Sequence, residues 1–129
     1  EAILGRLECA SEMTKRFTKR NLGDIPIEQA HGGSGSRQVL ITSDMLVGSH
    51  VEAMTKGYLE SGSVFDWHSH DTVDEFFVVL RGEGKFYFEA EVVDYRKGDV
   101  VTIPAGGRHK IEATGNETSE YFFVRVKAE

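Results

Sequence analysis

The chain has 129 residues, of which 40% are hydrophobic, and its formal net charge at pH 7 is −6. This length suits one compact domain with a single core. The acidic balance argues against a general binder of nucleic acid or of anionic membranes. No window has the length and composition of a membrane span or a signal peptide. The single cysteine, Cys9, has no internal disulfide partner, which favours a reducing cytoplasm.

Residues 1–36 are predicted to form an N-terminal arm, followed by the main domain at residues 37–129. Within the arm, Ser11 to Arg20 has the pattern of a short helix with Ser11 as its N-cap. We interpret its basic side chains as a solvated face rather than as a docking patch, because the run is short and the chain is acidic overall. The Gly- and Ser-rich end of the arm is predicted to be a flexible connector.

From Arg37 onward, short apolar runs are separated by turn signals, which is typical of an all-β sandwich or barrel. Gly82 and Gly98 fall in predicted turns, where glycine permits a positive φ. Nine strands are predicted, at Arg37–Thr42, Val51–Glu60, Phe65–His70, Glu75–Leu80, Lys85–Ala90, Val92–Tyr95, Val100–Ile103, His109–Ala113 and Tyr121–Lys127.

The predicted strand that begins at Glu75 is apolar on both faces. If Glu75 faces the interior, Phe77 and Val79 share its face, because side chains alternate along a strand. Phe76, Val78 and Leu80 then face outward. An outer face this apolar would be an exposed hydrophobic patch on a monomer. We therefore expect a homodimer in which this face is buried.

Three histidines and one glutamate form the strongest functional pattern. His68 and His70 are two residues apart, so both side chains leave the same face of a strand. Glu75 lies at an odd offset from them, and the polar stretch between supplies a turn that resets the phase, so that Glu75 also points inward. His109 follows the turn-rich Pro104–Gly107. Imidazole and carboxylate ligands suit a divalent metal, and four ligands on a six-coordinate ion leave two positions open for chemistry.

A His-x-His pair also occurs by chance, so the prediction depends on the whole set of residues and on the glycines around them. The set reads G-x5-H-x-H-x4-E-x6-G from Gly62 to Gly82 and G-x5-P-x-G-x2-H from Gly98 to His109. With these residues the chain resembles the cupin family, in which both motifs occur. Ala113 stands where the second cupin motif has asparagine, which leaves the four ligand positions intact.

The resemblance implies a cupin double-stranded β-helix, also called a jelly-roll barrel, with one divalent transition metal held by His68, His70, Glu75 and His109. Iron or manganese is the preferred ion, and nickel, zinc, cobalt or copper would also suit the ligands. The resemblance to cupins further implies a metal-dependent enzyme of the dioxygenase, decarboxylase, lyase or isomerase type, acting on a small carboxylate- or enol-bearing molecule. The alternatives are a non-catalytic module that binds or senses a small ligand, and a metal-free structural cupin.

Around the metal we expect a small apolar cavity. Met54, Lys56 and Tyr58 share one face of their strand, and the alternate residues share the other. If the first set faces inward, Tyr58 and Lys56 would orient a substrate carboxylate or transfer a proton. Trp67 should point away from the metal, and Arg108 is interpreted as a rim or surface charge.

Overall fold

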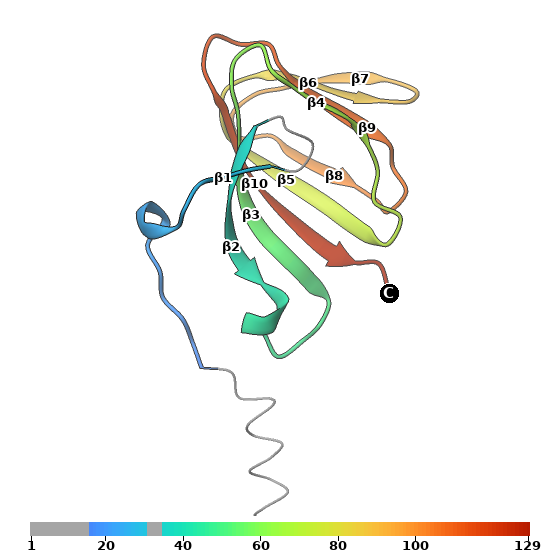
Figure 1. The fold of residues 1–129 in the computed structure, drawn as a ribbon. Coiled ribbons are helices and arrows are strands. Elements are labelled where there is room, and N and C mark those ends of the chain that lie inside the picture. Colours follow the sequence, from blue (N-terminus) through green and yellow to red (C-terminus); the bar gives the residue numbers. More distant parts are fainter. Residues whose placement is uncertain (1–15, 31–34) are drawn as a thin grey trace, which may run out of the picture.

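Two antiparallel β-sheets face one another in the computed structural model, which describes residues 16–30 and 35–129 (Figure 1). The larger sheet has the strand order β1-β2-β3-β10-β5-β8, with bounds Glu28–Gln29, Ser36–Thr42, Val51–Leu59, Ser119–Lys127, Val73–Arg81 and Val100–Ile103. The smaller sheet has the order β4-β9-β6-β7, with bounds Val64–His68, His109–Ala113, Gly84–Phe88 and Val92–Tyr95. Two short 3₁₀ turns, η1 and η2, span Leu22–Asp24 and Ser43–Met45.

All nine predicted strands are present, with ends that differ from the prediction by two residues at most. The additional short strand β1 pairs with β2, so the end of the predicted arm joins the sheet. Half of the predicted helix at Ser11 to Arg20 lies outside the described residues, and its described half, residues 16–20, is not helical. Among the described residues, no helix is long and apolar enough to span a membrane.

The core lies between the sheets and follows the period-two alternation of the strands. On β5, Glu75, Phe77 and Val79 are buried, whereas Phe76 and Val78 are each 37% exposed. The inward face of β5 was therefore predicted correctly. Phe77 meets Phe86 of the opposite sheet with ring centroids 5.4 Å apart, in the edge-to-face arrangement that aromatic rings favour.

The inward face of β3 is not the one that carries Lys56 and Tyr58, so these two side chains do not reach the cavity. Thr55, Gly57 and Leu59 are buried and face inward, so Lys56 and Tyr58 face outward. Lys56 Nζ lies 3.0 Å from Glu120 Oε1, and the Tyr58 hydroxyl donates a hydrogen bond to the Gln38 side chain. The assignment of these two residues to the cavity is corrected, because the alternation of a strand allows only one of the two sets to face inward.

Gln38 fixes the end of the N-terminal arm on the outside of β2. Its side-chain amide donates to the backbone carbonyl oxygens of Leu22 and Ile25, both at 2.9 Å. Gln38 itself is only 4% exposed. The arm thus covers the outer face of β2, while the outer faces of β5 and β8 keep exposed apolar side chains.

Candidate metal centre

His68 and His109 lie side by side on neighbouring strands of the smaller sheet. They are paired residues of β4 and β9, and their ring centroids are 4.1 Å apart. Glu75 approaches them from β5 of the opposite sheet, with its Oε1 at 3.5 Å from His109 Nε2. One ligand atom from each of the three residues lies within 4.8 Å of the other two. The predicted convergence of these three side chains across the barrel is therefore present.

Backbone carbonyls orient the two imidazoles. Nδ1 of His68 lies 2.9 Å from the carbonyl oxygen of Asp66, and Nδ1 of His109 lies 2.9 Å from that of Gly107. A carbonyl oxygen only accepts hydrogen bonds, so Nδ1 carries the proton in each ring. The lone pair of each ring is then on Nε2. Second-shell hydrogen bonds of this kind commonly fix metal-binding histidines.

Two atoms of the cluster are buried without a hydrogen-bond partner. They are Oε1 of Glu75 and Nε2 of His109. Glu75 is 4% exposed and His109 is 1% exposed, so water does not readily satisfy them. A buried polar atom without a partner is unfavourable, and a cation between the two sheets would satisfy both at once. The donor set of two imidazoles and one carboxylate fits a divalent transition metal.

His70 lies next to this group, beyond the end of β4. Its Nε2 is 3.7 Å from Glu75 Oε2, and its side chain is 31% exposed. The turn that follows β8 holds this segment, because the Gly106 N–H donates to the His70 carbonyl at 2.8 Å. The structure thus brings together three of the four predicted ligands, and it places the fourth at the exposed edge of the cluster.

Burial and neighbouring side chains together set the charge states of the cluster. Burial lowers the pKa of His68 and also that of His70 below the ordinary value of 6.5. For Glu75, burial acts to raise the pKa, but the neighbouring His109 and His70 side chains outweigh it and hold the pKa below 4.5. Neutral imidazoles beside an ionised carboxylate are the states that bind a divalent cation.

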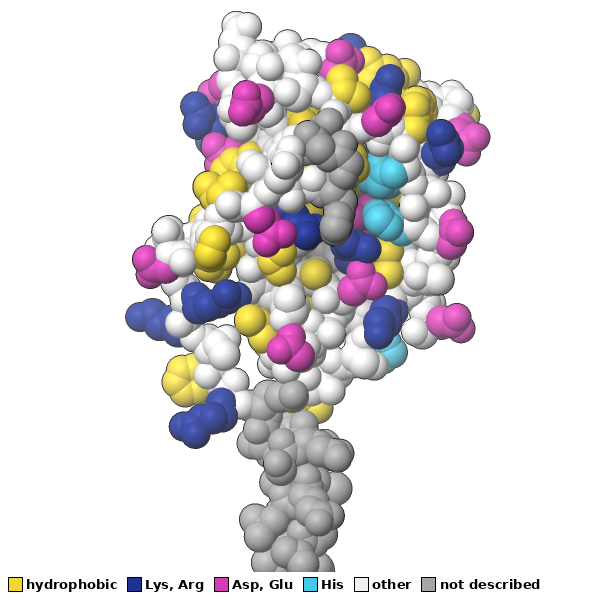
Figure 2. Space-filling view, viewed as in Figure 1, with side chains coloured by type: hydrophobic (Ala, Val, Ile, Leu, Met, Phe, Trp, Pro, Cys, Tyr) yellow, Lys and Arg dark blue, Asp and Glu magenta, His cyan; other side chains and the backbone are white. Residues whose placement is uncertain are grey.

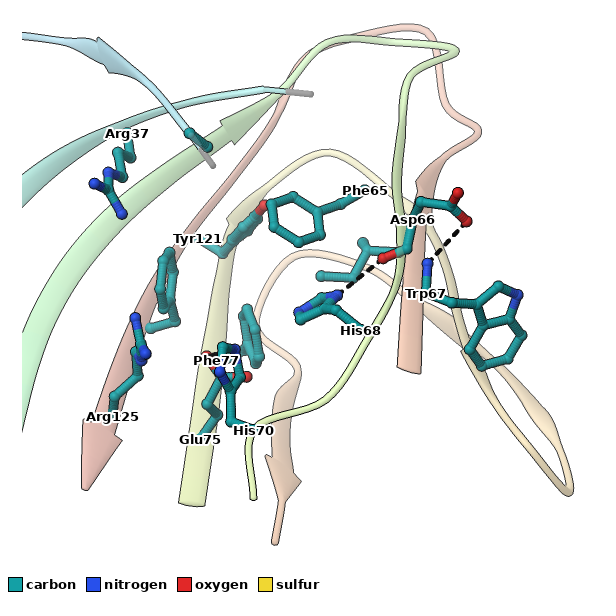
Figure 3. Close-up of a pocket in the computed structure, with 13 residues that line it drawn as sticks. Arg37, Phe65, Asp66, Trp67, His68, His70, Glu75, Phe77, Tyr121 and Arg125 are labelled. Atoms are coloured by element: carbon teal, nitrogen blue, oxygen red, sulfur yellow. Dashed lines mark hydrogen bonds and ion pairs between the residues drawn. The ribbon is translucent and has the colours of Figure 1, made fainter. Parts of the chain in front are cut away.

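A cavity of about 330 Å³ adjoins the cluster (Figure 3). This volume is at the small end of the range for small-molecule pockets, and the walls are mainly apolar, as in most such pockets. The charged side chains on the walls, other than the candidate ligands, are Arg37, Asp66 and Arg125. The apolar and aromatic side chains on the walls include Phe65, Phe77, Ile111, Tyr121 and Phe123.

Trp67 and Arg108 lie as the sequence analysis predicted. Trp67 turns away from the histidines in Figure 3, and the Arg108 guanidinium lies 5.7 Å from its ring centroid. Arg108 is exposed, as expected of a surface charge. Figure 2 shows histidine side chains beside Arg or Lys side chains where the site reaches the surface.

Sequence reasoning missed the two cavity arginines and Tyr121. Arg125 lies two strand positions after Phe123, on the same face as Glu75, with which it is paired across β10 and β5. A single arginine within the apolar run from Tyr121 to Val126 was the available signal. Arg37 was treated only as the first residue of a strand.

The fold and the buried cluster together define a small two-sheet β-barrel with a candidate divalent-metal centre inside it. A model of the cupin domain family matches residues 57–125, just over half of the chain and the part that contains all four predicted ligands. The chain belongs to the cupin domain family.

Solved structures with the same fold include a predicted oxalate decarboxylase of Thermotoga maritima, at 25% identity and a TM-score of 0.78 over 85% of this chain and 99% of that chain. The polyketide cyclase RemF of Streptomyces resistomycificus has a TM-score of 0.71 at 17% identity over 88% of this chain and 81% of that chain, which shows the fold alone. An uncharacterized protein of Methanocaldococcus jannaschii is 32% identical over 65 residues, 50% of this chain and 52% of that protein. The chain therefore spans about half the length of that curated relative.

Proposed function

We propose that this protein is a metal-dependent cupin enzyme that acts on a small organic substrate bearing a carboxylate or an enol. The observation that carries the proposal is the convergence of His68, Glu75 and His109, two of which have buried ligand atoms without a partner. The cluster adjoins an apolar cavity of about 330 Å³, large enough for a small molecule.

In this proposal Nε2 of His68, Nε2 of His109 and the Glu75 carboxylate hold the ion, and His70 is the fourth ligand. The ion would supply Lewis-acid polarisation of a substrate oxygen. The walls formed by Phe65, Phe77 and other apolar side chains would exclude water from the bound molecule. Iron or manganese remains our preferred ion, in a reducing cytoplasm.

The reaction classes that we propose are dioxygenase, decarboxylase, lyase and isomerase chemistry. The structural neighbour from Thermotoga maritima, a predicted oxalate decarboxylase, supports the proposal of a small carboxylate-bearing substrate. The fold alone hosts many activities, so the site and not the fold has to decide the reaction.

The first test is elemental analysis of the purified protein after reconstitution with Mn²⁺, Fe²⁺ or Zn²⁺. We expect about one ion per chain. His68→Ala and His109→Ala should each lower the occupancy at least about tenfold, because each removes a ligand, and the circular dichroism spectrum should keep its β-sheet form. His50→Ala is the matched control, because His50 is exposed and outside the cluster. No metal above background in the wild-type protein would contradict the proposal.

The second test separates the reaction classes. Substrate-dependent oxygen uptake by the Fe²⁺ protein identifies a dioxygenase, and anaerobic turnover with Zn²⁺ or Mn²⁺ identifies a lyase, isomerase or decarboxylase. Metal-dependent binding of a carboxylate without any product would favour the non-catalytic binding module instead.

A further inference from the structure

Arg125 lies beside the candidate metal-binding residues His68, Glu75 and His109, on the inner face of the larger sheet. It is paired with Glu75 across β10 and β5, so both side chains point to the same side of the sheet. Its guanidinium is part of the cavity wall, and Figure 3 shows it near Glu75 and His70. A permanent positive charge therefore lies next to the candidate ligands.

A β-bulge holds Arg125 in this position. The pairing of β10 with β3 shifts between Arg125 and Val126, where Arg125 faces Ala53 and Val126 faces Val51. Glu52 is the extra residue on β3, and its Oε1 accepts from Arg125 Nη2 at 2.8 Å. Bulges next to functional sites commonly redirect a side chain in this way. Glu52 acts as a positioning residue for the guanidinium.

One hydrogen-bond donor of the Arg125 guanidinium has no acceptor in the described part of the chain. Nε of Arg125 is buried and has no hydrogen-bond partner among the described residues. A buried N–H of a charged group without an acceptor is costly, and an arginine donates in a fixed planar geometry. Nε therefore lacks an acceptor, and the guanidinium that lines the cavity has donor capacity beyond its bond to Glu52.

The other charged side chains on the wall, besides the candidate ligands and Arg125, are Arg37 and the exposed Asp66. Arg37 contributes a second guanidinium to the wall from β2. The carboxylates that pair with the two arginines, Glu28 and Glu52, are 54% and 37% exposed and so are partly screened by solvent. A divalent ion at the cluster would exceed the single negative charge of Glu75. The ion and Glu75 together would therefore carry a net positive charge beside the apolar walls.

We propose that the cavity binds a small carboxylate-bearing anion, with one carboxylate oxygen accepting from the Arg125 guanidinium and another oxygen directed toward the His68, Glu75 and His109 cluster. This inference rests on the proposed function and specifies its substrate class. A carboxylate fits better than a phosphate, because Glu52 already occupies Nη2 of Arg125 and Glu28 occupies Nε and Nη2 of Arg37.

The test uses the full chain loaded with Zn²⁺ and isothermal titration with succinate, with its uncharged analogue succinamide and with inorganic phosphate. Wild-type protein should bind succinate saturably and bind succinamide and phosphate at least about tenfold more weakly. Arg125→Gln should weaken succinate binding about tenfold or more, because it removes a charge-assisted hydrogen bond. Lys56→Gln removes the same charge from the outer face and should change the affinity by less than about twofold.

Arg125→Lys keeps a charge but lacks the planar guanidinium, so its affinity for succinate should lie between those of the wild type and Arg125→Gln. It provides the test if Arg125→Gln does not fold. The zinc content should stay the same in every variant, because the four proposed ligands are intact.

The inference is overturned if the wild type shows no saturable succinate binding, if phosphate binds more tightly than succinate, or if the Arg125 variants bind succinate as the wild type does. Those results with a full zinc site leave the metal proposal standing. A wild-type protein that does not retain zinc would refute the metal proposal itself, and with it this inference.

Discussion

At the scale of single residues, the candidate metal cluster combines the buried carboxylate of Glu75 with one buried and one half-buried imidazole, both of fixed tautomer. The carbonyl oxygens of Asp66 and Gly107 are each two residues before the histidine that they orient. A local backbone contact therefore aims each Nε2, and only the position of Glu75 depends on the opposite sheet. The histidines would keep their orientation without the ion, so the local structure does not depend on metal binding. We therefore expect the alanine variants, which lose the metal, to fold.

Tyr121 gives a residue-scale prediction about pH. Burial raises the pKa of its hydroxyl well above the ordinary value of 10. The unfolded chain releases this proton near pH 10 while the folded chain retains it, so this contribution to stability is complete below about pH 10 and is lost as the pH rises toward the folded-state pKa. We expect the free energy of unfolding to fall by up to about 1.4 kcal/mol per pH unit above pH 10 for this group.

Urea unfolding between pH 8 and pH 11 measures this effect, with Tyr121→Phe as the comparison. The variant lacks the ionisable group, so its stability should decline less steeply in alkali than that of the wild type. Equal slopes for the two proteins would show that the Tyr121 hydroxyl is not protected from ionisation. Tyr95, whose pKa is also raised by burial, should keep some alkaline dependence in both proteins.

At the scale of secondary-structure elements, the side chains that line the cavity depend on which face of β3 points inward. Gly57 faces inward between Arg37 and Tyr121 in the pairing of β2, β3 and β10. A Cβ at Gly57 would lie 2.8 Å from the Tyr121 ring and 3.2 Å from the Phe123 ring. The absent side chain therefore allows the two aromatic rings to lie over β3.

We predict that Gly57→Ala destabilises the protein by about 1–3 kcal/mol, because overpacking in a filled core has costs of this size. The Tyr121 ring has little freedom to move, since it packs against Phe77 with centroids 5.5 Å apart. Urea unfolding measures the change. Gly48→Ala is the control, with no atom within 4 Å of the added Cβ, and its effect should stay within about 0.5 kcal/mol. Equal stabilities of the two variants would contradict the close approach at Gly57.

At the scale of the whole molecule, the outer face of β5 and β8 remains apolar. Phe76 and Val78 are each 37% exposed and Val100 is 67% exposed, and Val78 is paired with Val100 across the two strands. The arm residues Leu22 and Ile25 are bonded to the outside of β2 and not to these strands. We therefore retain the proposal of a homodimer in which a second copy covers this face.

The homodimer is tested by light scattering at micromolar concentration, which should give twice the mass of one chain. Val100→Lys should shift the mass toward that of a monomer, because it places a charge in the apolar contact. It should leave the thermal midpoint of the separated chain nearly unchanged, since Val100 is already exposed within one chain. A monomeric wild-type protein would refute the proposal.

The sequence by itself determined the strands and three of the candidate metal ligands. Periodicity and turn residues located nine strands, and the spacing of His68, Glu75 and His109 predicted a shared metal site. These features are local, because the alternation of a strand and the turns around it follow from neighbouring residues.

Only the tertiary structure decided which face of β3 lines the cavity and which cations reach it. Lys56 and Tyr58 face outward, and Arg37 and Arg125 line the cavity that adjoins the candidate metal cluster. A strand that carries apolar and polar residues on both faces does not reveal its inward side. That side is set by the register with β2 and β10, and by a bulge that brings Glu52 to Arg125 from another strand. Contacts between residues far apart in sequence fixed both features, and for that reason they were beyond the reach of local patterns.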